Sequence, residues 1–464
     1  AEDQHQIAVD QRKMADVERQ KAEDQHQIAV DQRKMADVER QKAEDQKQIA
    51  VEQREAAEAA RQKAERLRLL SVARSLAIQA TKIQPLGEGR QLSALLALQA
   101  FYFNQRYGGS PLDPDIYSAL EAARATFDQE QSGVLRGHSD GVRAVAFAPR
   151  GGKLVSAGDD GVVRLWSLED PMSSRVLMRR EGIGVRRLVF DAAGHLAGGT
   201  TAGRVWVWDS VAAESEARLL VGAASSAVSA LNYASDGRLL ATGSDGWKRV
   251  WETGQEQGEA PADGGSAKRL YATAVGGQRL AIGGEDGHIW LWESGNWQRP
   301  PQQLDMGHSA IRRLAFAPDG SRLVAGTNTG ALLVWQSGDW ESEPLQLLGH
   351  SSAITGLSFH GDGRLLASSS LDRTVRIWDV EEETSIVITQ DDWVWDVAFS
   401  PDGHRLASAG ADRTVRLWHT YVEELAAVVE ANVTRAMTLA EWKNFVGEDI
   451  PYEPVGTRSL GVTP

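Results

Sequence analysis

The chain of 464 residues contains no cysteine. This absence excludes disulfide bonds, thiolate catalysis and zinc sites built on cysteine, and it suits a reducing compartment such as the cytoplasm. No run of apolar residues approaches the roughly 18 that are needed to cross a bilayer, so no membrane span is predicted. The balance of 64 acidic against 50 basic residues argues against general nucleic-acid binding, because phosphate backbones are recognised through basic side chains.

The sequence also has none of the short motifs that mark common catalytic and metal sites. A GxxxxGKS/T phosphate loop, an HExxH motif, a GxSxG motif and an EF-hand loop are all absent. The ten histidines are spread along the chain without the spacing of a ligand cluster. We therefore predict no catalytic residue, no metal site and no cofactor in this sequence, and any enzymatic domain would lie upstream of it.

Proline and glycine are both missing before Pro85, so nothing interrupts a helix in this region. A block of 21 residues at 1–21 recurs identically at 22–42 and in a diverged form at 43–63. Because 21 residues make three heptads, equivalent side chains stay in register along a helix. One heptad column is alanine throughout, and the column before it contains Ile7, Met14, Ile28, Met35 and Ile49.

Residues 1–66 are therefore predicted to form one long charged helix, for which two interpretations remain open. The alanine column allows another helix to approach closely, which favours a coiled coil or bundle formed by self-association. The lack of a continuous second apolar column instead favours a solitary helix that serves as a spacer. Since the chain starts with alanine in register with the repeat, we also expect it to be a piece of a longer polypeptide.

Two further helical regions are predicted on either side of a long central region. Residues 67–131 contain two strongly apolar segments and a helix start at Asp113-Pro114, which indicates a small α-helical connector. Residues 421–464 are predicted to form a helical tail in which Thr438 and Glu441 have the spacing of a capping box.

Seven short apolar strands between these regions each end in tryptophan. The tryptophans are separated by 42, 43, 41, 43, 43 and 40 residues, and they are Trp166, Trp208, Trp251, Trp292, Trp335, Trp378 and Trp418. Such a period, with several short strands in each repeat, is typical of a β-propeller. We therefore predict a mainly β fold in which residues 132–420 form a seven-bladed propeller.

Two of the repeats share four polar or aromatic residues at matching positions. They are His138, Ser156, Asp160 and Trp166 in blade one and His350, Ser368, Asp372 and Trp378 in blade six. Together with the glycines before the histidines, these residues resemble the WD40-repeat family, to which G protein β subunits belong. The resemblance implies that each set forms a buried hydrogen-bonded tetrad that is structural rather than catalytic. It also implies that residues 132–136 supply the outer strand of the last blade and so close the ring. The other blades lack parts of the pattern, and blades two to four are expected to be the softer side of the ring.

A wider resemblance covers roughly residues 67–464. The stretch that begins at Asn432 is similar to the tail of bacterial WD40 proteins of the STAND NTPase and caspase-like groups, although the cysteine found near the end of that tail is absent. In those proteins a coiled helix and an apolar connector also precede the propeller. The resemblance implies that this chain is the C-terminal sensor part of a larger signalling or defence protein.

The family resemblance also implies that partners bind where the inner strands of the propeller begin. Trp393 lies beside this rim, and by alignment the rim residues are Arg143, Arg186, Ser229, Arg312, Thr355 and Trp395. Because arginine and tryptophan are typical hot-spot residues, a mouth lined by them is predicted to bind an acidic or extended peptide. Two plainer interpretations remain open, in which either tryptophan packs between blades and any single arginine is a solvated surface charge.

Three functions are compatible with these features. The first is a sensor or scaffold propeller that binds a protein or peptide and is carried on an oligomerising helical stalk. The second is a structural protein whose helices form a bundle or filament decorated by propellers. The third, an enzyme acting through the propeller itself, has no supporting residue in the sequence.

Overall fold

The computed structural model describes residues 2–84, 86–127, 133–169, 173–211, 216–220, 226–252, 255, 269–292, 297–305 and 309–455. The chain divides into two units, Ala1–Ser71 and Val72–Pro464. The first unit is helical, and the second contains a group of short helices and seven small β-sheets. Within the described residues, no helix combines the length and the hydropathy that crossing a membrane requires.

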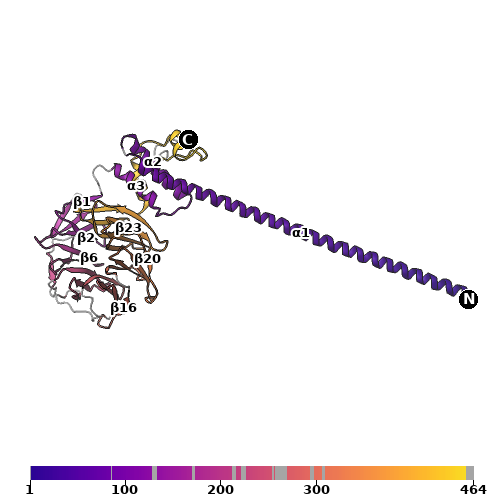
Figure 1. Cartoon of the computed structure of the whole chain (residues 1–464), viewed down its shortest axis with the longest axis horizontal. Coiled ribbons are helices and arrows are strands. Elements are labelled where there is room, and N and C mark those ends of the chain that lie inside the picture. Colours follow the sequence, from indigo (N-terminus) through magenta and orange to yellow (C-terminus); the bar gives the residue numbers. More distant parts are fainter. Residues whose placement is uncertain are drawn as a thin grey trace. The chain divides into compact units, whose positions relative to one another are not determined.

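The first unit belongs to helix α1 (Glu2–Lys82), which runs without interruption through the repeated blocks (Figure 1). The predicted long helix is therefore confirmed. Charged side chains pair along its surface, as in the 3.2 Å contact between Arg19 Nε and Glu23 Oε1, and each such pair contributes about 0.2–0.5 kcal/mol. The apolar side chains of the repeat remain exposed, 57% for Ile28 and 65% for Met35.

The short helices of the second unit pack as one group. They are α2 (Glu88–Arg106), α3 (Pro114–Phe127), α4 (Val422–Ala431) and α5 (Leu439–Phe445), and α3 packs against both α2 and α4. Aromatic residues fill the group, since Trp442 is fully buried and its ring meets that of Phe103 edge to face at 6.0 Å. The predicted capping box is confirmed, because Thr438 and Glu441 each accept a hydrogen bond from the other's backbone. Connector and tail therefore meet, although they flank the propeller in sequence.

Seven antiparallel sheets form a ring, one for each predicted repeat. The innermost strands of successive sheets contact one another in chain order, and that of the seventh sheet contacts that of the first. The seven-bladed propeller predicted from the tryptophan period is therefore confirmed; its blades are coloured in chain order in Figure 1. Blade one contains β2 (Val142–Phe147), β3 (Lys153–Gly158), β4 (Val162–Ser167) and β5 (Ser174–Arg179), and blade two contains β6 (Val185–Phe190), β7 (Leu196–Thr200), β8 (Val205–Trp208) and β9 (Arg218–Leu220).

The remaining blades repeat this order from the inner to the outer strand. In blade three the described strands are β10 (Val228–Tyr233), β11 (Leu239–Gly243) and β12 (Lys248–Trp251), and blade four contains β13 (Leu270–Gly276), β14 (Arg279–Gly284), β15 (His288–Trp292) and β16 (Gln302–Asp305). Blade five contains β17 (Ile311–Phe316), β18 (Arg322–Thr327), β19 (Leu332–Gln336) and β20 (Leu345–Leu347). Blade six contains β21 (Ile354–Phe359), β22 (Leu365–Ser370), β23 (Thr374–Asp379) and β24 (Thr384–Thr389), and blade seven contains β25 (Val394–Phe399), β26 (Arg405–Gly410), β27 (Thr414–His419) and β1 (Val134–Arg136).

The first and last strands of the propeller lie in the same sheet. β1 pairs antiparallel with β27, and Leu135 stands opposite Val415. Of the predicted closing segment, residues 133–136 are described, and they place the outer strand of blade seven as expected. The pairing covers the strand edges at the point where the ring closes.

The hydrophobic core of the propeller lies between neighbouring blades. Where blades seven and one meet, the buried side chains of Val142, Leu154 and Trp166 pack with those of Ala407 and Val415. Clusters of the same kind join the blades that follow. Because each blade buries its faces against its neighbours, the ring holds the inner strands in fixed positions around the central channel.

Each inner strand has a β-bulge at the same place. In blade one, Val142 pairs with Gly158 and Ala144 pairs with Ala157, so one residue between them is extra. The register shifts in the same way in the other six blades, and the extra residues are Arg143, Arg186, Ser229, Tyr271, Arg312, Thr355 and Trp395. A bulge turns its side chain out of the alternation of a regular strand. The seven bulges therefore present one side chain from each blade at the same level of the ring.

Candidate functional site

The four residues of the first predicted tetrad lie together inside blade one. Nδ1 of His138 is 2.9 Å from Asp160 Oδ2, and Nε2 of the same ring is 2.8 Å from Ser156 Oγ. The indole Nε1 of Trp166 donates to Ser156 Oγ at 2.7 Å. Because this serine hydroxyl is fully buried and bonded to both an imidazole and an indole, it is not placed to act as a nucleophile.

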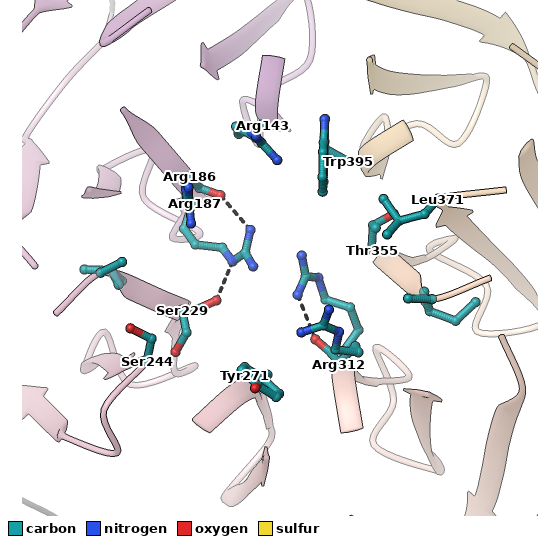
Figure 2. A pocket seen from close by; sticks show the side chains of 15 residues that line it. Arg143, Arg186, Arg187, Ser229, Ser244, Tyr271, Arg312, Thr355, Leu371 and Trp395 are labelled. Atoms are coloured by element: carbon teal, nitrogen blue, oxygen red, sulfur yellow. Dashed lines mark hydrogen bonds between the residues drawn. The ribbon is translucent and has the colours of Figure 1, made fainter. Parts of the chain in front are cut away.

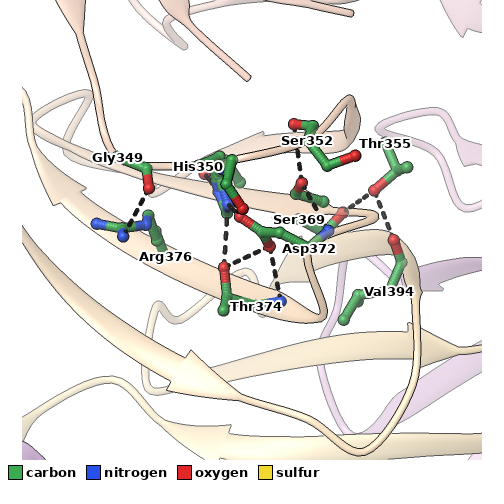
Figure 3. A network of polar contacts seen from close by, with 12 residues as sticks. Gly349, His350, Ser352, Thr355, Ser369, Asp372, Thr374, Arg376 and Val394 are labelled. Carbon is green, nitrogen blue, oxygen red and sulfur yellow. Dashed lines mark hydrogen bonds and ion pairs between the residues drawn. The ribbon is translucent and has the colours of Figure 1, made fainter. Parts of the chain in front are cut away.

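The second predicted tetrad has the same arrangement in blade six. Figure 3 shows two of its members, His350 and Asp372, beside Thr374. His350 contacts Asp372 at 2.8 Å and Ser368 at 2.7 Å, and Trp378 Nε1 donates to the same serine at 2.8 Å. In blade seven a glutamine takes the place of the histidine. There Ser408 Oγ accepts from Gln390 Nε2 at 2.6 Å and from Trp418 Nε1 at 2.9 Å.

Blades two to four lack the serine around which these networks form. The residues in register with it are Gly198, Ala241 and Ile282. Within the described residues, the buried Nε1 atoms of Trp208 and Trp292 have no hydrogen-bond partner. The serine-centred networks thus occupy adjacent blades six, seven and one, and the softness of blades two to four stays a prediction.

The seven bulge residues line the mouth of the central channel, where they surround a cavity of about 230 Å³ (Figure 2). Five of the residues that line this cavity are arginines, and none is acidic. The arginines are Arg143, Arg186, Arg187, Arg312 and Arg313. The chain carries an overall charge of −14, so this concentration of positive charge is a local property of the mouth.

Aromatic rings and one arginine form a stack on one side of the mouth. The guanidinium carbon of Arg143 lies 3.7 Å from the ring centroid of Trp395, and its Nε donates to Asp159. The ring of Trp395 in turn meets that of Trp393 edge to face at 5.8 Å. Trp393 is 49% exposed, so the stack ends in an indole that is open to a partner.

A second stack involves blades four and five. The guanidinium carbon of Arg312 lies 4.9 Å from the ring centroid of Tyr271. Arg186 is exposed, and within the described residues its side chain forms no hydrogen bond or ion pair. The mouth therefore offers at least two guanidinium groups that are not paired with a carboxylate of the described chain.

Below the bulge residues lies a second layer of charged side chains. Each of its members directly follows a bulge residue, and they are Arg187, Arg313 and Asp396. Arg187 donates to the carbonyl oxygens of Ser229 and Arg186 at 2.6 and 2.7 Å. Both arginines and Asp396 also line a deeper cavity of about 490 Å³, which continues from the mouth into the channel.

The charges in this second layer are partly withdrawn from water. Burial lowers the pKa of Arg187 to about 10. Burial, together with the nearby charge of Arg187, also lowers the pKa of Arg313. Burial raises the pKa of Asp396, although the two arginines act in the opposite direction. The shifts show that one carboxylate does not fully compensate two desolvated guanidinium groups.

Asp396 is held in place by the backbone around it. Its Oδ2 accepts a hydrogen bond from the N–H of Val145 in the neighbouring blade at 3.1 Å. A Cβ at Gly356 would lie 2.9 Å from Asp396 Oδ1 and 2.6 Å from Ser369 Oγ. The glycine therefore provides the space that this carboxylate occupies.

All six rim residues predicted from the sequence line the cavity, namely Arg143, Arg186, Ser229, Arg312, Thr355 and Trp395. Trp393 lies beside the cavity, and its ring contacts that of Trp395, which lines the cavity. The fourth-blade tyrosine and the second-layer residues were not predicted from the sequence; they are Tyr271, Arg187, Arg313 and Asp396. A signal for two of them was present, because the Arg-Arg pair recurs at the same strand position in blades two and five.

The described residues contain no group of three or more His, Asp or Glu side chains that could hold a metal ion. The mouth presents guanidinium donors and aromatic faces, and the deeper cavity adds the buried carboxylate of Asp396. Such groups bind and orient anionic or extended ligands.

Comparison with known proteins identifies five of the seven repeats. The model "WD domain, G-beta repeat" matches residues 129–167, 216–252, 300–336, 342–379 and 383–419. The small ribosomal subunit protein RACK1 of Medicago sativa is 29% identical over 138 residues, which are 26% of this chain and 42% of that protein. The guanine nucleotide-binding protein subunit beta of Zea mays is 32% identical over 125 residues, which are 25% of this chain and 33% of that protein.

The matched region spans less than half the length of each of these two relatives. Among solved structures, the WD40 β-propeller domain of Doa1 is similar with a TM-score of 0.55 and 23% identity. The likeness covers 62% of this chain and 96% of that domain. At this identity the likeness shows the fold, which is the seven-bladed ring described above.

Proposed function

The propeller of this chain is a seven-bladed WD40-repeat propeller, and we propose that it is a non-catalytic scaffold whose protein partner docks at the mouth of the central channel. The observation that carries the proposal is the ring of seven bulge residues, since every blade directs one side chain to the same place. Three of these side chains are arginines and one is a tryptophan. These two residue types are enriched among the side chains that contribute most to binding energy at protein interfaces.

The partner segment that fits this mouth best is acidic and extended. Arg186 and Arg312 lack a carboxylate partner among the described residues, and Trp393 exposes one face of an aromatic stack. An extended acidic peptide can lay a carboxylate against the guanidinium groups while its other side chains contact the indole. Both relatives carry names that describe subunits of larger assemblies, which supports a role in binding other proteins.

We also propose that residues 1–66 associate with copies of themselves and raise the propeller on a helical stalk. The exposed isoleucines and methionines of the repeat support this, because a partner helix would cover them. A second candidate function rests on the same observation. If self-association of the helix is the main function, the protein is a structural element that forms a bundle or filament decorated by propellers.

We propose a wider context on the basis of the tail and connector sequences. Their similarity to bacterial STAND-type and caspase-like WD40 proteins supports a sensor role within a larger cytoplasmic signalling or defence protein. The intact mass of the native polypeptide in its source cells tests this context. A mass well above 50.5 kDa supports it, and a mass equal to that of the present chain contradicts it.

The docking site itself is tested with a fluorescein-labelled glutamate-rich peptide and the full chain. We expect saturable binding that weakens as ionic strength rises, because screening reduces the attraction between the exposed charges. Arg186→Ala should reduce the affinity. Arg150→Ala is the matched control, since Arg150 is exposed in the turn at the opposite end of the first inner strand. Equal loss in both variants would show that the peptide responds to overall charge and not to the mouth.

A further inference from the structure

The mouth and the second layer of the channel together contain more positive charge than the described residues neutralise. Five guanidinium groups line the mouth cavity. Two carboxylates reach them, because Asp159 pairs with Arg143 and Asp396 interacts with Arg187 and Arg313. Five positive and two negative charges leave a net charge of +3 in one narrow space. A ligand that enters the channel therefore meets donors whose charge is unmatched.

Arg187 and Arg313 approach the channel from distant blades. The first belongs to blade two and the second to blade five, which are as far apart as a seven-membered ring allows. Both side chains nevertheless line the mouth cavity and the deeper cavity, so they extend toward the same region of the channel. Figure 2 shows the side chain of Arg187 reaching into the open centre of the ring.

The two guanidinium groups are held in the same way. Arg187 donates through an Nη atom to the carbonyl oxygen of Arg186 at 2.7 Å, and Arg313 does the same to the carbonyl oxygen of Arg312 at 2.7 Å. Each arginine is thus fixed by the bulge residue that precedes it. Donors fixed in advance lose little freedom when an anion binds, which strengthens the binding.

We propose that the channel binds a phosphoryl dianion between Arg187 and Arg313, with Arg186 and Arg312 at its entrance. The proposal rests on the proposed function, because it names the chemical group that enters the docking mouth. A phosphoryl group carries about −1.5 to −2 charges and three strong acceptor oxygens. It therefore matches several guanidinium donors at once, whereas a single carboxylate neutralises at most one of the three unmatched charges.

The space between the side chains of the second layer suits a small ligand group. Blades three and four place Ala230 and Ala272 at the position that arginine occupies in blades two and five. These small side chains line the deeper cavity together with the two arginines and leave its centre open. Two sources can supply the same phosphoryl chemistry, namely a phosphorylated side chain of the partner and a free phosphate ester.

Substitution of Asp396 provides a test in which the affinity for a phosphoryl dianion should increase. This carboxylate lines the deeper cavity together with both arginines, so it competes with any anion that enters. Asp396→Asn keeps the shape of the side chain and removes its charge. The variant should bind a phosphoryl dianion about three- to tenfold more tightly, since one repulsive interaction is lost. A loss of folding does not produce a gain in affinity.

The experiment uses the full chain and isothermal titration calorimetry with two probes. One is inorganic pyrophosphate, and the other is an acidic peptide made with phosphoserine or with serine at its centre. Arg313→Gln should weaken binding of the phosphorylated probe at least about tenfold, because charge-assisted hydrogen bonds are lost. Arg150→Gln is the control and should leave the affinity unchanged. Thermal unfolding checks that each variant folds. If Arg313→Gln does not fold, the affinity of Asp396→Asn for the phosphorylated probe is the deciding measurement.

The outcomes separate the proposals. Tight binding of the phosphopeptide alone supports a phosphorylated partner, and binding of pyrophosphate as well supports a free phosphate ester. Equal affinity for the phosphoserine and serine peptides, with no pyrophosphate binding, overturns the phosphoryl site but leaves the acidic docking site standing. If the glutamate-rich peptide also fails to bind, the proposed function fails too. An affinity that is unchanged or weaker in Asp396→Asn overturns the phosphoryl site as well.

Discussion

The guanidinium carbon of Arg143 lies 3.7 Å from the centroid of the Trp395 ring. The two residues occupy the bulges of blades one and seven, which are adjacent because the ring closes on itself. The contact therefore joins the beginning and the end of the propeller sequence at the channel mouth. It also orients Trp395 against Trp393, the most exposed aromatic ring of this stack.

Replacing Trp393 with alanine should abolish most binding of an acidic partner peptide while the fold stays intact. Tryptophan hot spots typically contribute about 2 kcal/mol or more, which corresponds to a roughly 30-fold loss of affinity. The side chain is half exposed, so thermal stability should change by no more than about 0.5 kcal/mol. Fluorescence anisotropy and thermal unfolding measure the two quantities on the same sample.

The control for this prediction is Val176→Ala. Val176 is also exposed, but it lies on the outer strand β5, away from the channel. Its substitution should leave peptide binding unchanged. Binding that survives both Trp393→Ala and Trp395→Ala would exclude the aromatic stack from the docking site.

Ser156→Ala should destabilise the propeller, because the hydroxyl accepts from Trp166 and contacts His138 in a buried position. Each buried polar group left without a partner costs about 1–3 kcal/mol. Ser139→Ala is the matched control, since its side chain is exposed in the same blade. Urea unfolding should separate the two variants clearly. Equal midpoints would show that the tetrad is not a principal source of stability.

The Asp372 carboxylate predicts a dependence of stability on pH. Burial alone would raise the pKa of Asp372, but hydrogen bonds from His350 and Thr374 outweigh it and hold the pKa well below its ordinary value. In the unfolded chain the pKa is about 3.9. The stabilisation is therefore complete above about pH 4 and is lost progressively as the pH falls below that value, because the unfolded chain then binds more protons.

Asp372→Asn tests this dependence. The amide does not titrate, so the variant should be less stable than the native chain at pH 7 and the difference should shrink as the pH falls below about 4. Urea midpoints at pH 7, 4 and 3 provide the measurement. A difference that stays constant over this range would mean that the charge of Asp372 does not stabilise blade six.

Substitutions in the helical repeat can distinguish a self-associating coiled coil from a solitary spacer helix. Replacing the exposed Ile28 and Met35 with lysine should dissociate a coiled coil, because charge would then enter the helix interface. Sedimentation equilibrium of the full chain measures the change in mass. Lysine at Gln27 and Gln41 serves as the control, because both side chains are exposed outside the apolar column. If the native chain is already a monomer, the spacer interpretation is correct.

The ring could be predicted from the sequence because its repeat is encoded locally. A tryptophan recurs every 40 to 43 residues at the end of an apolar strand, and each such tryptophan stands in register with the strand before it in the same blade. Tight turns and the alternation of apolar and polar residues along a strand depend on residues that are close in sequence. They can therefore be predicted from the sequence alone. The long helix was equally accessible, since neither glycine nor proline interrupts it.

The site was only partly predictable because of the bulges. In a regular strand, side chains alternate between faces, and the residue after a channel-facing one should point away. The extra residue in each inner strand breaks this rule, so Arg186 and Arg187 both line the channel, as do Arg312 and Arg313. Tyr271 was not predicted, and blade four lacks the Gly-His pair that precedes the inner strands of blades one, five and six.

The sequence by itself determined the number of blades, the helix that precedes them and the residues available to form the tetrads. Each of these depends on spacing along the chain. Only the tertiary structure decided which charges share the channel, because blades two, five and seven contribute Arg187, Arg313 and Asp396 from positions far apart in sequence. Closing the ring brings these groups into a space where water screens them poorly, and their mutual interaction becomes the main chemical property of the site.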